Sequence, residues 1–371
     1  MTSMKGHYGS IFVSTIIAFA FTVAVRPTAA QATIDCGSTY QKFLDSRTGP
    51  ELEKLRSAVS AGSEYLAKCS EVEGQEEIKA YVRDQVPKLS EMIKTKELVS
   101  RFINAVPAKN WTEAVSSGKE LVAMNHPASI DVMIVLASIG YQNAMANPAA
   151  DDAGNDTIAT AKAVLQKLNE GSTSETYGLF QFGYKTKDCP DGKANAASWM
   201  NNAIGRITYS RPNQRKSALP YLFAANKSGC ELKNDPEIYR LIGAWYFDEA
   251  VALEKGLAEK VKAVGGEENE ELKVDDALIN GYLERAIDAY SRAYSNARNN
   301  NNLTQAYKDG LYKKLESLFD FRYNGKRDNM EKLIAEVQNS PFPDPETEVK
   351  PVFDPPVSSV TPAAAVPTKK P

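Results

Sequence analysis

Apolar residues recur at spacings of three, four and seven over most of the chain, and this period constrains the fold more than any other feature. Such spacing places the apolar side chains on one face of an amphipathic helix. About a dozen helical segments of roughly 10–25 residues follow one another between residues 48 and 339, and no clear alternating strand pattern interrupts them. The sequence therefore predicts an all-α protein. The first stripe consists of Leu52, Leu55, Val59, Leu66 and Cys69.

Short turn signals separate the predicted helices, for example Arg211-Pro212, Asp235-Pro236 and Gly265-Gly266. Helices joined by short turns form antiparallel hairpins. Many such hairpins without a sheet build either a bundle or a stacked solenoid, and internal repetition distinguishes the two.

Composition excludes several classes of function. The chain has 371 residues, of which 43% are apolar and 25% charged, as in soluble globular proteins. Its net charge of −3 argues against nucleic acid as a partner. It contains two histidines, and removal of a leader would leave only His126. That residue precedes Pro127 at an expected helix end, where a cationic imidazole would interact favourably with the helix dipole.

Residues 1–32 are typical of a secretory signal peptide. A positive start at Lys5 leads into an apolar run of about 15 residues, which is short for a membrane span. Ala30-x-Ala32 suits cleavage after Ala32. We expect an exported protein of the periplasm or the extracellular space, with no integral membrane segment once the leader is removed. An uncleaved anchor is the alternative.

Four cysteines remain after the leader: Cys36, Cys69, Cys189 and Cys230. An even number in an exported chain favours disulfides. Pairing sequence neighbours, Cys36 with Cys69 and Cys189 with Cys230, needs the least chain reach. Each such bridge would close a loop of roughly 35–40 residues and contribute about 3–4 kcal/mol in the chain-entropy model. The other two pairings and four free thiols remain alternatives, whereas a zinc site lacks any Cys-x-x-Cys motif.

One part of the chain resembles the tetratricopeptide repeat. Small and large residues alternate at fixed helical spacing there, followed by Asp235-Pro236 and an aromatic-x-x-apolar-Gly-x-x-Tyr helix. Small residues let the two helices of a hairpin approach closely, and aromatic side chains fill the holes opposite. A second, less well preserved trio follows in a later helix. The matching residues are Ala218, Leu222, Ala225, Pro236, Tyr239, Ile242, Gly243, Tyr246, Ala286, Tyr290 and Ala293.

The resemblance spans residues 107–339 and implies an α-solenoid that binds a protein or peptide partner, with neither catalysis nor a cofactor. Residues 33–106 match no repeat and are expected to form a separate helical region. Residues 340–371 hold nine of the nineteen prolines and are expected to form a disordered tail. An aromatic cluster, Tyr177, Phe180, Phe182 and Tyr184, could belong either to the core or to a binding face.

Signatures of catalysis are missing from the sequence. There is no Gly-x-Ser-x-Gly, His-Glu-x-x-His, Gly-x-x-x-x-Gly-Lys or Gly-x-Gly-x-x-Gly. We therefore expect a non-catalytic scaffold of the cell envelope without metal or cofactor. Two alternatives stay open: a wall-associated hydrolase that uses a carboxylate pair on a helical scaffold, and a structural envelope component.

Overall fold

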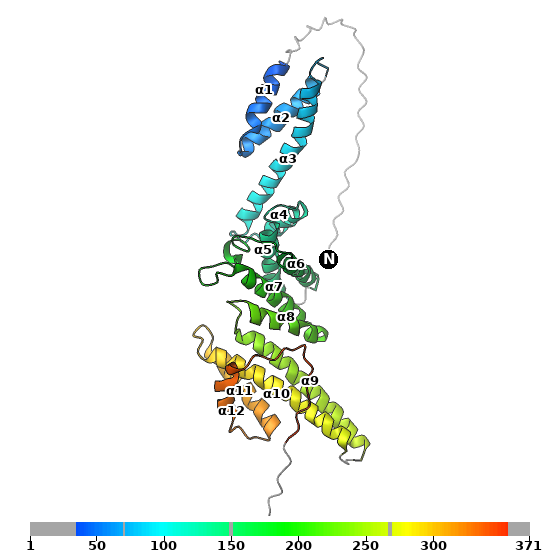
Figure 1. Ribbon diagram of the computed structural model, residues 1–371, viewed down its shortest axis with the longest axis vertical. Helices are drawn as coiled ribbons and strands as arrows, with labels where there is room; N and C mark the ends of the chain where they lie inside the picture. The colour runs from blue at the N-terminus through cyan, green and yellow to red at the C-terminus, as the bar shows by residue number, and fades with distance from the viewer. Residues whose placement is uncertain (1–34, 70, 148–150, 266–268, 355–371) are drawn as a thin grey trace, which may run out of the picture. The chain divides into compact units, whose positions relative to one another are not determined.

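The computed structural model describes residues 35–69, 71–147, 151–265 and 269–354. Over these ranges it contains twelve α-helices, three short 3₁₀ turns and no strand (Figure 1), which confirms the all-α prediction. No helix in the same ranges is long and apolar enough to span a bilayer. The expected signal peptide, residues 1–32, and the end of the expected tail, residues 355–371, lie outside the described residues.

The chain divides into two compact units, Met1–Ile93 and Lys94–Pro371. In the first, α1 (Cys36–Arg47) and α2 (Leu52–Lys68) pack with the beginning of α3 (Glu76–Ala105). Phe43, Leu55 and Tyr65 are completely buried at its centre. A disulfide joins Cys36 to Cys69 with a Cα–Cα distance of 5.9 Å, as the pairing of sequence neighbours predicts.

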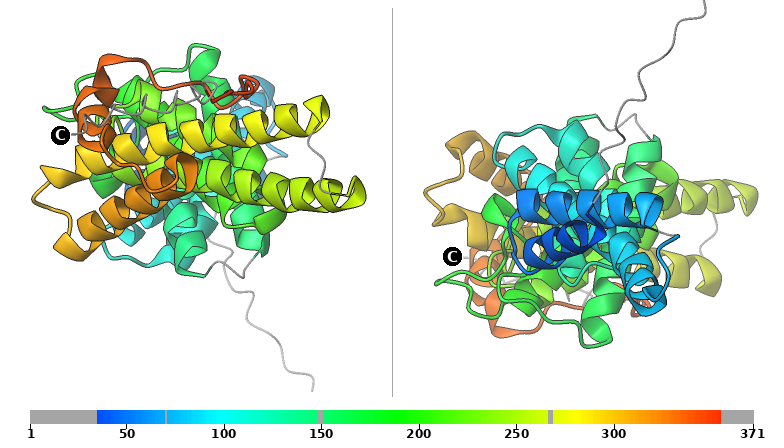
Figure 2. Two further views of the ribbon diagram at one scale, coloured as in Figure 1. Left: turned by 90° about the horizontal axis from the view of Figure 1, so that it is seen from below. Right: turned by 90° about the horizontal axis from the view of Figure 1, so that it is seen from above.

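The second unit is a succession of helices in which consecutive helices pack against one another, except that the last packs against the helix two positions before it (Figures 1 and 2). Its longest hairpin consists of α9 and α10, which lie side by side in both figures. This arrangement is the stacking of antiparallel hairpins that the sequence predicts. The helices after α3 are α4 (Trp111–Ala123), α5 (Ser129–Ala146), α6 (Asp151–Asn169), α7 (Gly192–Tyr209), α8 (Arg215–Ser228), α9 (Pro236–Ala263), α10 (Glu270–Arg298), α11 (Gln305–Tyr323) and α12 (Met330–Glu336). The 3₁₀ turns are η1 (Phe180–Phe182), η2 (Pro212–Gln214) and η3 (Val337–Asn339).

Several of these helices begin at an N-capping residue whose side chain accepts a hydrogen bond from the helix backbone. Asn110, Asp191, Asp235 and Thr304 each accept a hydrogen bond from a backbone N–H of the first helical turn. Such a cap satisfies a donor that has no partner inside the helix. Pro236 then occupies the first position of α9, where no N–H is required.

The eleven residues that carry the repeat resemblance are all buried, on α8, α9 and α10. α9 and α10 approach closely at Gly243, where an added Cβ would lie 2.8 Å from the Tyr290 ring. A glycine here lets α9 and α10 come together, and the aromatic side chain fills the space that it leaves.

Residues 340–354, which we call the strap, run along α10 in the opposite direction to that helix, with a turn from Asp344 to Thr347. Arg292 donates to the Ser340 carbonyl at 3.0 Å, and further along the strap the Val352 N–H donates to the Ala277 carbonyl at 2.7 Å. The expected tail thus starts on the surface of α10. Its overall composition is rich in proline, but Phe342 and Val349 lie in its first half and bury apolar surface against the helices.

Candidate binding groove

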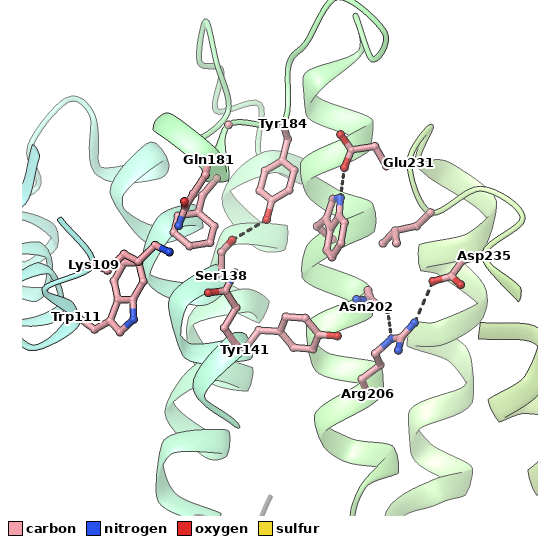
Figure 3. Close-up of a pocket in the computed structure, with 15 residues that line it drawn as sticks. Lys109, Trp111, Ser138, Tyr141, Gln181, Tyr184, Asn202, Arg206, Glu231 and Asp235 are labelled. Carbon is pink, nitrogen blue, oxygen red and sulfur yellow. Dashed lines mark hydrogen bonds and ion pairs between the residues drawn. The ribbon is translucent and has the colours of Figure 1, made fainter. Parts of the chain in front are cut away.

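A cavity of about 890 Å³ opens between α5 and α7 in the second unit. The start of α4, the loop of residues 176–190 and the turn between α8 and α9 complete its walls (Figure 3). We call this cavity the groove. Its apolar surface comes from Leu232 and from five aromatic side chains: Trp111, Tyr141, Phe182, Tyr184 and Trp199.

Aromatic contacts hold the loop against the helices. Trp111 from α4 meets Phe182 of the loop edge-on, with ring centroids 6.2 Å apart. Trp199 from α7 lies against Tyr184 at 6.0 Å with the planes tilted by 31°. Trp111 and Phe182 lie far apart in the sequence, so the groove exists only in the folded unit.

Tyr184 is fixed by polar contacts at both ends. The Ser138 hydroxyl donates to the Ile134 carbonyl, and its oxygen then accepts the Tyr184 hydroxyl at 2.7 Å. Asn195 donates its side-chain N–H to the Tyr184 carbonyl at 3.0 Å. Burial raises the pKa of Tyr184 to about 12, so this phenol stays protonated and acts as a donor at physiological pH.

The loop itself needs an unusual backbone. Gly178 has φ of +115°, and an added Cβ would collide with the Phe182 carbonyl, so only glycine fits there. Asp131 on α5 accepts hydrogen bonds from the Gly178 N–H at 2.8 Å and from the Ser174 hydroxyl at 2.5 Å. This carboxylate anchors the loop over the groove.

The acidic side chains of the groove already have partners. Glu231 accepts the Trp199 indole N–H at 2.7 Å. Asp235 accepts from Arg206 at 3.0 Å and, through its other oxygen, from the Glu237 backbone N–H at 2.8 Å. Arg206 also donates to the Asn202 carbonyl oxygen at 2.8 Å, which fixes both side chains against α7 (Figure 3).

A disulfide joins two of the groove's walls. Cys189 ends the loop and Cys230 lies in the turn between α8 and α9, with a Cα–Cα distance of 5.9 Å. This is the second predicted pairing of sequence neighbours. Cys230 directly precedes Glu231, so the bridge also helps to fix the partner of Trp199.

The residues singled out in the sequence make up only part of this site. Of the aromatic cluster left open above, Phe182 and Tyr184 line the groove, whereas Tyr177 is buried in the core and Phe180 is 52% exposed. None of the eleven repeat residues lines the groove. His126 lies just after the end of α4, outside any helix, and its Nδ1 accepts the Ala128 N–H at 3.2 Å.

The side chains of the described residues suit binding. They contain no group of three or more histidine, cysteine or acidic residues that could hold a metal ion. The groove combines aromatic faces with amide, hydroxyl and ammonium groups, the mixture that fixes and orients a ligand in a concave site. No known protein family, curated protein or solved structure matches the chain.

Proposed function

We propose that the protein is an exported, non-catalytic binding scaffold whose groove takes a polypeptide segment of a partner. The observation that carries this proposal is the groove itself. Its aromatic walls come from four separate segments, and a disulfide fixes one of them, the loop, to the turn between α8 and α9. Preorganised walls of this kind lower the cost of ordering on binding.

The helical architecture supports the same function. Stacked helical hairpins present surfaces along which extended peptides bind. Hairpin packing at Gly243 and Tyr290 is consistent with the tetratricopeptide-like pattern of the sequence, and proteins of that kind bind other proteins. The two cysteine pairs suit an oxidising compartment and so support export.

The hydrolase alternative would need a free carboxylate pair. Glu231 and Asp235 are the acidic residues that line the groove, and both accept hydrogen bonds from side chains of α7. A general acid or nucleophile must instead be available to the substrate. This arrangement favours binding over hydrolysis.

Site-specific photo-crosslinking tests the proposal. A photoreactive amino acid would replace Gln142, an exposed residue at the groove, and separately Gln166, an exposed glutamine on α6 outside it. In the native envelope we expect position 142 to yield a discrete adduct whose crosslinked peptide mass spectrometry identifies. Position 166 should give none.

Two results would overturn the proposal. One is equal labelling from positions 142 and 166. The other is hydrolysis of peptidoglycan fragments by the purified protein that Glu231→Gln abolishes, since a binding scaffold needs no such activity.

A further inference from the structure

The hydrogen-bonding groups left free in the groove include three donors. Asn202 gives its carbonyl oxygen to Arg206, which leaves its side-chain N–H₂ facing the cavity although the residue is only 1% exposed. The Tyr141 hydroxyl and the Lys109 ammonium also line the cavity, and neither has a partner among the described residues. Both acidic side chains, by contrast, already accept hydrogen bonds.

A ligand that matches these free donors must offer acceptors. A polypeptide rich in proline meets this condition because in the polyproline II conformation its carbonyls are free of internal hydrogen bonds. Proline-rich segments also need apolar surfaces on which their rings can pack, and they dock into grooves lined by partly exposed aromatic rings. Trp111, Tyr141 and Trp199 are half-buried in the walls.

The protein already holds a proline-containing segment of its own, the strap, against aromatic rings and an arginine. The strap contains Pro341, Pro343, Pro345 and Pro351. Aromatic rings and arginine donors hold it in place: Phe342 lies 4.9 Å from Tyr239 between ring centroids, and Arg292 donates to the preceding carbonyl of Ser340. The groove likewise offers aromatic rings and hydrogen-bond donors, with nothing from the strap in its lining.

From these observations we propose that the groove binds a proline-rich segment of a partner protein in the polyproline II conformation. This proposal rests on the proposed function, and it names the chemistry of the partner. The segment's carbonyls accept hydrogen bonds from Asn202, Tyr141 and Lys109, and its pyrrolidine rings pack against the aromatic walls.

Calorimetric titration of the full chain with two peptide probes tests it. A decamer of L-proline should bind at least about tenfold more tightly than a glycine–serine decamer of equal length. Tyr141→Ala should weaken binding about tenfold, and Tyr141→Phe, which keeps the ring and loses only the donor, should weaken it less. The matched control Phe342→Ala removes an aromatic of the strap site and should leave binding within about twofold.

Three results would overturn this inference. The first is that the proline decamer does not bind. The second is that Phe342→Ala abolishes binding of the decamer while Tyr141→Ala does not. The third is that an oligomer of N-acetylglucosamine binds in a Tyr141-dependent manner and the decamer does not. If the decamer fails while crosslinking at position 142 still captures a polypeptide, the proposed function stands and only the choice of segment is wrong.

Discussion

At the scale of single residues, the groove depends on side chains that satisfy one another's hydrogen-bonding groups. Tyr184 donates to Ser138, which donates to the Ile134 carbonyl, so the phenol can be buried without an unpaired hydroxyl. Arg206 is held between Asn202 and Asp235 in the same way. These contacts fix the walls before any ligand arrives.

Burial of Tyr184 predicts a loss of stability at alkaline pH. Its pKa in the folded protein, about 12, exceeds the ordinary value of about 10, so between these pH values the unfolded chain loses the proton while the folded protein keeps it. The free energy of unfolding must therefore fall as pH rises through this window. Tyr184→Phe should lose less stability there than the wild type, by roughly 1–3 kcal/mol, in urea unfolding followed from neutral pH to about pH 12.

Other buried tyrosines do not remove the expected difference in alkaline stability between the wild type and Tyr184→Phe. Burial also raises the pKa values of Tyr209 and Tyr246 to about 12, so both proteins should lose some stability in the alkaline window. The informative quantity is the difference between wild type and variant. Equal alkaline slopes would show that Tyr184 is not buried as a protonated phenol.

At the scale of helices, the packing of α9 on α10 follows from Gly243 and the residues opposite. An alanine Cβ there would lie 2.8 Å from the Tyr290 ring and 3.1 Å from the Ala289 Cβ. Because both neighbours are enclosed in the hairpin, Gly243→Ala should lower the free energy of unfolding by about 1–3 kcal/mol in urea titrations.

The control lies on the same helix. Gly256 is exposed and has no atom within 4 Å of an added Cβ, so Gly256→Ala should stabilise α9 by up to about 1 kcal/mol through helix propensity. If Gly243→Ala lowers the free energy of unfolding and Gly256→Ala raises it, the effect of tight packing is separated from that of helix propensity. A stabilising Gly243→Ala would contradict the close approach of α9 and α10.

Sequence reasoning could predict what local spacing encodes. Helices and their caps follow from residues that are near one another in the chain, and the two disulfides follow from pairing each cysteine with the next one along the sequence. The groove does not, because Trp111, Tyr141, Tyr184, Trp199 and Asp235 belong to separate segments that share no local pattern. Composition does not predict the strap for a different reason. Averaged over residues 340–371, the composition is dominated by proline, and the two apolar residues that pack on the helices, Phe342 and Val349, contribute little to it.

At the scale of the whole molecule, each compact unit has its own core and its own disulfide. The buried cluster around Phe43 and Tyr65 contains only residues of the first unit, and Cys36–Cys69 lies beside it. The second unit contains the remaining clusters and Cys189–Cys230. Separate cores predict separate unfolding transitions, because cooperativity follows shared buried contacts.

Two double variants test this prediction with two optical probes. All three tryptophans, Trp111, Trp199 and Trp245, lie in the second unit, so their fluorescence reports that unit alone, whereas circular dichroism reports helices of both. The disulfides join residues 33 and 41 positions apart, and removing either should cost its own unit about 3–4 kcal/mol. Replacing Cys36 and Cys69 with serine should lower the midpoint of one transition in circular dichroism and leave the midpoint of the fluorescence transition unchanged. Replacing Cys189 and Cys230 should lower the fluorescence midpoint. A single transition that both variants shift equally would mean that the two units unfold as one.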